Sequence, residues 1–318
     1  MIGVIGAGAF GTALAVALAQ EGREVALWAR DPAHVDKMAA TRRNEARLPG
    51  VTLPQSIVIS NALPNNVTAV LIALPMQALR LSLPLFASSF DGLPIIACCK
   101  GIDLTTNQGP TALIAAACPN SPTAVLTGPS FAADIARGLP TALTLACADD
   151  ATGEQLQKLI STLTLRIYRT TDVIGAELGG ALKNVVAIAA GVTIGAGLGE
   201  SARAALMTRG YSEMVRAAQN LGAQPETLAG LSGLGDLVLT CTSAQSRNFR
   251  YGLALGAGKP FDPAVTVEGV ATAQAMAKLA LAHGLDLPIT AMVAALCTGK
   301  VTLSDAIYSL LSRPLKQE

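Results

Sequence analysis

Two lysines stand in surroundings that favour chemistry over simple solvation. Lys183 lies within an otherwise apolar helical stretch rich in Gly and Ala, residues 176–191. Desolvation and a neighbouring cation would both lower the pKa of its ammonium group from about 10.4, toward the range where it can exchange a proton. Lys100 follows the apolar run 94–99, and ligands of open α/β sheets gather at the carboxyl ends of strands. The alternatives are a lysine reaching solvent from a helix surface and a solvated lysine at a strand end.

An acid beside a glycine turn is a suitable partner for such a lysine. Asp236 precedes an apolar run, and Thr240 lies four residues further on. The carboxylate can orient Lys183 and balance local positive charge, although Asp and Thr near glycines also serve as turn or cap residues. The chain has two histidines, His34 and His283, and neither lies beside a motif. Lysine is therefore the better candidate for a general acid.

A basic tripeptide offers a site for an anion. Ser246, Arg247 and Asn248 precede a predicted helix over residues 248–255. A phosphate at this place can receive the guanidinium fork, the first helical N–H groups and the Asn amide together. Ser246 is also a suitable N-cap, and the two roles are compatible.

A glycine-rich turn follows the first predicted strand. Gly6, Gly8 and Gly11 come after the apolar residues 1–5 and open a predicted helix over residues 12–21. The first glycine permits a tight turn, the second lets the backbone approach a pyrophosphate, and the third lets the helix pack close to the strand. The order predicts dinucleotide binding, with a merely tight strand-to-helix turn as the alternative.

The residue about 20 positions beyond such a turn reads the adenosine ribose. Arg30 stands there and is followed by Asp31. An arginine suits a 2′-phosphate, so we expect NADPH to be accepted and preferred, with NADH left open. A solvated charge pair at a strand end is the alternative.

Alternating strands and helices in the first half predict a Rossmann-type, doubly wound α/β sheet in residues 1–172. Its predicted strands are residues 1–5, 24–28, 56–60, 67–74, 94–99, 123–127 and 142–147. Residues 173–318 are predicted to form an all-helical C-terminal domain. Its predicted helices are residues 176–191, 202–221, 248–255, 272–283 and 289–298.

Composition narrows the class of protein. The 318 residues carry a formal net charge of +1 without long charged runs, which argues against a nucleic-acid partner. Six cysteines include no CxxC pair, so neither a metal site nor a disulfide framework is expected. The apolar run 185–199 is shorter than the roughly 18–20 residues of a membrane span. We expect a cytoplasmic protein with a small-molecule partner; the apolar residues 176–199 also suit a homodimer surface.

Several segments in a fixed order carry a resemblance to a known family. They are Cys98-Cys99-Lys100-Gly101, Gly128-Pro129-Ser130-Phe131-Ala132, Leu182-Lys183-Asn184, Leu231-Ser232-Gly233-Leu234-Gly235-Asp236 and Ser246-Arg247-Asn248. Together with the glycine-rich turn, and up to Glu268, the chain resembles the bacterial NAD(P)-dependent glycerol-3-phosphate dehydrogenase family. The resemblance implies an oxidoreductase that interconverts dihydroxyacetone phosphate and sn-glycerol 3-phosphate for glycerophospholipid synthesis, with NADPH or NADH as cofactor.

The resemblance also assigns roles to residues. As catalytic it implies Lys183, Lys100, Asp236 and Thr240. As substrate-binding it implies Lys100, Gly128, Ser130, Lys183, Asp236, Ser246, Arg247 and Asn248. As cofactor-binding it implies Gly6, Gly8, Ala9, Phe10, Gly11, Arg30, Lys100, Ala132, Arg247 and Glu268.

The chain departs from the family pattern at two places. Ala9 and Phe10 stand where the family usually has Ser and Trp, and Ser201 stands where it often has Asn. Two other functions stay open, a related hydroxyacid dehydrogenase with a carboxylate substrate and a non-catalytic dinucleotide sensor. The phosphate-binding tripeptide argues against the first, and the two lysines with Asp236 argue against the second.

Overall fold

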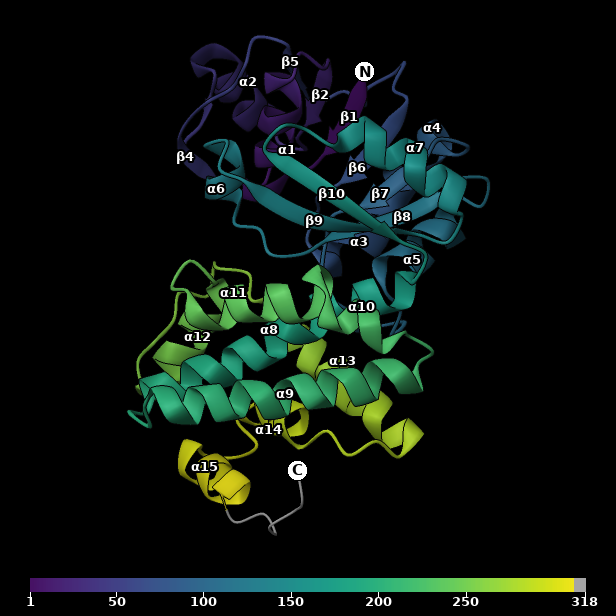
Figure 1. Cartoon of the computed structure of the whole chain (residues 1–318). Helices are drawn as coiled ribbons and strands as arrows, with labels where there is room; N and C mark the ends of the chain where they lie inside the picture. Colours follow the sequence, from purple (N-terminus) through teal and green to yellow (C-terminus); the bar gives the residue numbers. More distant parts are fainter. Residues whose placement is uncertain (312–318) are drawn as a thin grey trace.

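An eight-stranded sheet forms the N-terminal part of the protein in the computed structural model, which describes residues 1–311 (Figure 1). The strand order is β10-β9-β8-β7-β6-β1-β2-β5. These strands are β1 (Ile2–Ile5), β2 (Val25–Trp28), β5 (Ile57–Ser60), β6 (Ala69–Ile72), β7 (Ile95–Ala97), β8 (Thr123–Thr127), β9 (Thr141–Cys147) and β10 (Leu165–Thr170). A separate antiparallel pair consists of β3 (Arg43–Asn44) and β4 (Leu48–Thr52). We call residues from β1 through β10 the α/β region.

Helices cover both faces of the sheet because successive strand residues point to opposite sides. Val4 of β1 belongs to one buried apolar cluster and Ile5 to another. The helices are α1 (Ala9–Gln20), α2 (Pro32–Thr41), α3 (Met76–Ser82), the 3₁₀ turn η1 (Leu83–Leu85), α4 (Ala87–Phe90), α5 (Pro110–Ala117), α6 (Ala132–Ala136) and α7 (Asp150–Ile160). This arrangement is a Rossmann-like, doubly wound domain, which confirms the predicted fold class.

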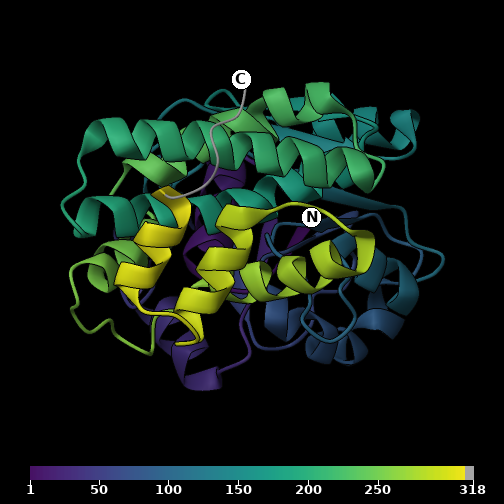
Figure 2. The ribbon, with the colours of Figure 1, turned by 90° about the horizontal axis from the view of Figure 1, so that it is seen from below.

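The remaining described residues form helices only, which we call the helical region. They are α8 (Val173–Gly195), α9 (Glu200–Asn220), α10 (Pro225–Ala229), the π-helical turn η2 (Leu231–Gly235), α11 (Asp236–Thr242), α12 (Arg247–Gly256), α13 (Glu268–His283), α14 (Pro288–Cys297) and α15 (Leu303–Leu311). Helix α8 is central and packs against α9, α11, α12 and α13. Seen from below, the C-terminal helices α14 and α15 lie on the face away from the sheet (Figure 2).

Helix α8 is longer than the apolar pattern predicted. It spans 23 residues and is long and apolar enough to cross a membrane by length and composition, yet 89% of its most apolar window is buried inside the protein. The helix is therefore the core of the helical region. Its burial within the same chain leaves little of the stretch 176–199 for a homodimer surface, so the homodimer stays a prediction.

Three features of the sheet differ from the sequence expectations. Strand β10 was missed, because its burial alternates with exposed residues instead of forming an apolar run. Strand β9 runs antiparallel to β8, so the sheet is mixed. Residues 41–47, where the sequence predicted no strand, contain β3 of the small hairpin.

The division of the chain at residues 172 and 173 stays a prediction. In the structure β10 ends at Thr170 and α8 begins at Val173, with the Asp172 side chain accepting a hydrogen bond from Gly175 N.

Candidate active site

A single carboxylate joins the two candidate lysines. Lys100 Nζ lies 2.5 Å from Asp236 Oδ2, and Lys183 Nζ lies 2.6 Å from Asp236 Oδ1. Lys183 Nζ also donates to Thr240 Oγ1 at 2.7 Å. The structure therefore brings all four candidate catalytic residues into one hydrogen-bonded cluster, although they come from distant parts of the chain.

The cluster is shielded from water. The side chains of Asp236 and Lys183 are 1% and 8% exposed. Burial lowers the pKa of Lys183 to about 8; Asp236 opposes this shift, and the nearby cation of Lys100 adds to it. A lysine with a pKa near 8 can both give and take a proton at physiological pH.

The elements explain this geometry. Asp236 is the first residue of α11 and directly follows the π-helical turn η2, a feature that often occurs at functional sites. Thr240 lies one helical turn further on, so its hydroxyl shares the face of Asp236. Lys183 projects from the centre of α8 toward both residues.

Lys100 reaches the cluster from the α/β region. It follows β7 and, besides Asp236, donates to the Gly128 carbonyl oxygen at 3.0 Å. Strands β7 and β8 are parallel neighbours, so the segments that follow them meet at one edge of the sheet. The Ser130 hydroxyl donates to the same Gly128 oxygen at 3.1 Å, and Ala132 begins α6 two residues later.

The phosphate-binding candidates lie at the start of α12. The Ser246 hydroxyl accepts a hydrogen bond from Phe249 N at 3.2 Å and is the N-cap, while Arg247 is the first helical residue. The Asn248 amide donates to Asn184 Oδ1, and its oxygen accepts from Gly269 N, both at 2.9 Å. Asn248 thus connects α12 with α8 and α13, and both its amide nitrogen and its amide oxygen already make a hydrogen bond within the protein.

Asn184 is a residue of this site that sequence reasoning left without a role. It is buried on α8 directly after Lys183 and accepts the hydrogen bond from Asn248. Its place next to Lys183 in the sequence could have pointed to a role in the site. Its hydrogen-bond partner Asn248, however, lies 64 residues further along the chain.

The glycine-rich turn fits a dinucleotide. Gly6 has φ +113°, and a Cβ there would lie 2.7 Å from the Ala73 carbonyl oxygen, while a Cβ on Gly11 would collide with the Gly6 carbonyl oxygen. A Cβ on Gly8 would instead project into open space. Gly8 is the N-cap of α1 and supplies no side-chain capping bond, so an anion can approach the helix N-terminus. Ala9 and Phe10 are partly buried against the core.

A second missed residue supports this turn from behind. Asn44 of β3 is 1% exposed, and its amide donates to the Ala7 carbonyl oxygen at 3.0 Å and to Thr12 Oγ1 at 2.8 Å. The Arg42 guanidinium donates to the Pro54 and Ile57 carbonyl oxygens and fixes the base of the hairpin. No spacing rule links residue 44 to residue 7, so this contact could not be predicted from the sequence.

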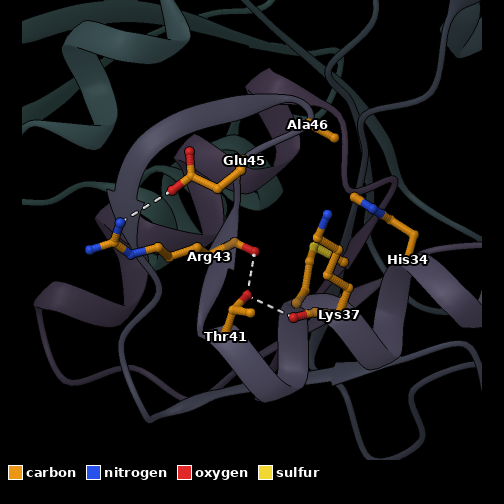
Figure 3. A pocket seen from close by; sticks show the side chains of 7 residues that line it. His34, Lys37, Thr41, Arg43, Glu45 and Ala46 are labelled. Atoms are coloured by element: carbon orange, nitrogen blue, oxygen red, sulfur yellow. Dashed lines mark hydrogen bonds and ion pairs between the residues drawn. The ribbon is translucent and has the colours of Figure 1, made fainter.

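Arg30 is exposed just after β2, which pairs with β1 along the sheet edge that carries the glycine-rich turn. Asp31 accepts from Ala33 N at 3.0 Å and caps α2. A surface hollow of about 440 Å³ lies further along α2 and is lined by His34, Lys37, Met38, Thr41, Arg43, Glu45 and Ala46 (Figure 3). None of the predicted site residues lines this hollow.

Glu268 is the first residue of α13 and contacts the α/β region. Its carboxylate accepts from Met76 N at 3.3 Å. Burial raises its pKa, and the nearby Arg247 lowers it. Among residues 1–311, no group of three or more His, Cys, Asp or Glu side chains could hold a metal ion.

Comparisons with known proteins place these residues in a family. Family models described as the N-terminus and the C-terminus of NAD-dependent glycerol-3-phosphate dehydrogenase match residues 1–153 and 172–308. A glycerol-3-phosphate dehydrogenase (NAD(P)+) of Cereibacter sphaeroides is 64% identical over 319 residues, covering 100% of both chains. Its namesake from Paracoccus denitrificans is 60% identical and covers 100% of this chain and 99% of its own.

Solved structures agree with this assignment. A glycerol-3-phosphate dehydrogenase from Coxiella burnetii has 36% identity and a TM-score of 0.93, with 98% of each chain covered. A D-mandelate dehydrogenase shares the fold alone, at 16% identity and a TM-score of 0.63 over 96% of this chain and 100% of its own. The chain therefore belongs to the NAD-dependent glycerol-3-phosphate dehydrogenase family and is an NAD(P)-dependent oxidoreductase.

Proposed function

We propose that this enzyme interconverts dihydroxyacetone phosphate and sn-glycerol 3-phosphate, with Lys183 exchanging the proton and Arg247 holding the phosphate. The observation that carries these roles is the chain of contacts Lys100–Asp236–Lys183, which joins the α/β region to the helical region. It places a buried amine of lowered pKa where the two regions meet.

Reduction of the ketone requires a hydride, a proton and a grip on the phosphate. When bound, the nicotinamide ring supplies the hydride in reduction and accepts it in oxidation. As the carbonyl carbon gains the hydride, its π electron pair moves to the oxygen, which takes a proton from the Lys183 ammonium group. In the reverse direction neutral Lys183 removes the proton from the hydroxyl group.

The neighbours of Lys183 support this exchange. Asp236 and Thr240 hold its amine by hydrogen bonds of 2.6 and 2.7 Å, so its nitrogen has a fixed position. Lys100, on the other side of Asp236, can stabilise the negative charge that develops on the substrate oxygen. Lys100, Gly128 and Ser130 form one hydrogen-bonded group that we assign to substrate contact.

The start of α12 suits the phosphate of the substrate. Arg247 offers a planar fork for bidentate contact, and the helix N-terminus adds N–H donors and positive potential. Ser246 acts as the N-cap, and Asn248 anchors the helix end while one amide hydrogen is left for a ligand. A carboxylate substrate would make weaker use of this site, which favours the phosphorylated ketone over the oxoacids.

The cofactor is assigned to the glycine-rich turn, with Ala132, Glu268, Lys100 and Arg247 along its path to the substrate. Arg30 is proposed to favour NADPH through the 2′-phosphate, and its exposure after β2 leaves it free to reach a ligand. The ratio of the NADPH and NADH Michaelis constants in Arg30→Ala tests this. An unchanged ratio would remove Arg30 from the role.

The cellular setting is proposed from the cysteines and from the family. All six cysteines are free thiols, which fits the reducing cytoplasm. Supply of glycerol phosphate for glycerophospholipid synthesis is proposed from the family. The homodimer stays a prediction that sedimentation equilibrium can test.

One assay decides the substrate class. The absorbance of NADPH is followed with dihydroxyacetone phosphate and, separately, with a panel of 2- and 3-oxoacids. We expect turnover with dihydroxyacetone phosphate. Turnover with an oxoacid alone would overturn the proposal, and cofactor binding without any turnover would favour a dinucleotide sensor.

A further inference from the structure

Two helices that begin with proline start against a carboxylate from a neighbouring long helix. Helix α5 begins at Pro110, and Glu177 of α8 accepts a hydrogen bond from Thr111 N at 2.8 Å. Helix α14 begins at Pro288, and Glu213 of α9 accepts from Ile289 N at 2.6 Å and Thr290 N at 3.1 Å. A negative charge is favourable at a helix N-terminus, where free N–H groups and the helix dipole meet.

The two contacts differ in what they connect. Glu213 joins two helices of the helical region, whereas Glu177 joins the helical region to the α/β region. Figure 1 shows α5 at the edge of the α/β region that faces the helices below. Gly109, the N-cap of α5, leaves room for this contact because it has no side chain. A Cβ at this position would collide with the Glu177 carboxylate.

Both ends of the Glu177 contact are tied to catalytic candidates. Glu177 lies six residues before Lys183 on α8, a rise of about 9 Å along one rigid helix. Helix α5 packs against β7 and β8, and Lys100 lies just beyond the end of β7. The Glu177 contact therefore links the element that carries Lys183 to the sheet edge that carries Lys100.

We propose that Glu177 is a positioning residue, which sets the place of Lys183 opposite Lys100 by binding the N-terminus of α5. This inference rests on the proposed roles of the two lysines. Glu177 acts through α8 and not by contact with substrate. The carboxylate is partly buried; burial raises its pKa, and the hydrogen bonds to Thr111 lower it.

The test compares Glu177→Gln and Glu177→Ala with a matched control, Glu213→Gln. The glutamine keeps an acceptor for Thr111 N but loses the charge, while the alanine loses both. The measurements are kcat, the Michaelis constants of both substrates, the pH dependence of kcat and the midpoint of thermal unfolding.

In Glu177→Ala we expect kcat to fall about 10- to 100-fold, because small misplacements of catalytic groups have effects of this size. The Michaelis constant for NADPH should change less than about twofold, because the glycine-rich turn is untouched. The alkaline limb of the pH profile should move, since Asp236, Lys100 and Cys241 shape the charge environment of Lys183. The kcat of Glu177→Gln should lie between that of Glu177→Ala and that of the wild type.

The control separates positioning from general packing. Glu213→Gln should lower the unfolding midpoint by about 2–4 °C and leave kcat and the pH profile unchanged. Wild-type kcat and pH profile in Glu177→Ala would overturn the inference. A loss of kcat in both Glu213→Gln and the Glu177 variants, in proportion to the thermal stability that each variant loses, would also overturn the inference.

The outcomes also separate this inference from the proposed function. If Glu177→Ala does not fold, a wild-type profile in Glu177→Gln decides against the inference and a shifted profile decides for it. If Lys183→Met keeps full turnover, the proposed function fails. If only the Glu177 variants keep full turnover, the positioning role alone fails.

Discussion

At Lys183, opposing effects set the proton affinity of the amine. Burial removes water from the ammonium group and lowers its pKa, while Asp236 stabilises the charged form. The balance leaves the pKa at about 8, below the usual value of about 10.4. The side chain is thus poised to change protonation during turnover.

Lys183→Met should remove the proposed proton donor while keeping the volume of the side chain. We expect kcat to fall about 10²- to 10⁴-fold, the usual contribution of a positioned acid. NADPH binding, measured by isothermal titration calorimetry, should be retained because the glycine-rich turn lies apart from Lys183. Near-normal turnover in this variant would exclude Lys183 as the acid.

The pH dependence should differ in sign between the two directions. In the proposed mechanism reduction needs protonated Lys183, so its kcat should be constant below about pH 8 and fall as the pH rises through this pKa. Oxidation needs the neutral amine, so its kcat should rise through the same pH. Initial rates in both directions from pH 6 to 10 test this, and parallel profiles would contradict it.

Arg247→Lys tests the proposed phosphate site. A lysine keeps the charge but loses the bidentate fork. We expect the Michaelis constant for dihydroxyacetone phosphate to rise about 10-fold or more, equivalent to about 1.4 kcal/mol, the strength of a charge-assisted hydrogen bond. An unchanged constant would place the phosphate elsewhere.

Among the elements, the hairpin β3–β4 has an unexpected role. Asn44 fixes the glycine-rich turn by two hydrogen bonds, although the turn and the hairpin are separated by all of α1, β2 and α2. The turn therefore depends on its own glycines for shape and on a distant amide for support. The π-helical turn η2 has a comparable role, because it leads directly into the helix that begins with Asp236.

Asn44→Ala should weaken cofactor binding, because the Ala7 carbonyl oxygen and the Thr12 hydroxyl lose a buried donor. We expect the Kd for NADPH to rise about 10-fold, in line with about 1–3 kcal/mol for an unsatisfied buried group. Asn120→Ala is a matched control, since Asn120 bonds Asp91 at the exposed surface. Equal affinity in the two variants would exclude a role of Asn44 in cofactor binding.

For the whole molecule, Asp236 connects the two regions. Its two oxygens each bind one lysine, and only Lys100 comes from the α/β region. Without this carboxylate, the buried Lys183 and the partly buried Lys100 would face each other uncompensated, which is costly in a site of low dielectric.

Asp236→Asn should therefore affect catalysis and stability together. The pKa of Lys183 should fall further below about 8, so the decline of reduction should begin at lower pH. The midpoint of thermal unfolding should also fall, since breaking a buried pair costs about 3–5 kcal/mol. Calorimetry and the pH profile test both effects, and an unmoved profile would show that Asp236 does not act on Lys183.

The local features of the fold were predictable. The glycine-rich turn lies between a strand and a helix, and seven of the strands have apolar runs that mark them, as at residues 123–127. Strand β10 was missed because residues such as Arg166 and Tyr168 interrupt its apolar pattern. The antiparallel course of β9 was missed because apolar pattern reports burial and not direction.

The sequence by itself determined the glycine-rich turn between a strand and a helix, the α/β class of the first part of the chain and, through several motifs together, the family. Each of these features depends on residues that lie close together in the sequence. Only the tertiary structure decided that Lys100 and Asp236, 136 residues apart, share a hydrogen bond and that Asn44 supports residue 7. The burial that lowers the pKa of Lys183 was likewise decided there, because burial and charge depend on distances that chain packing alone creates.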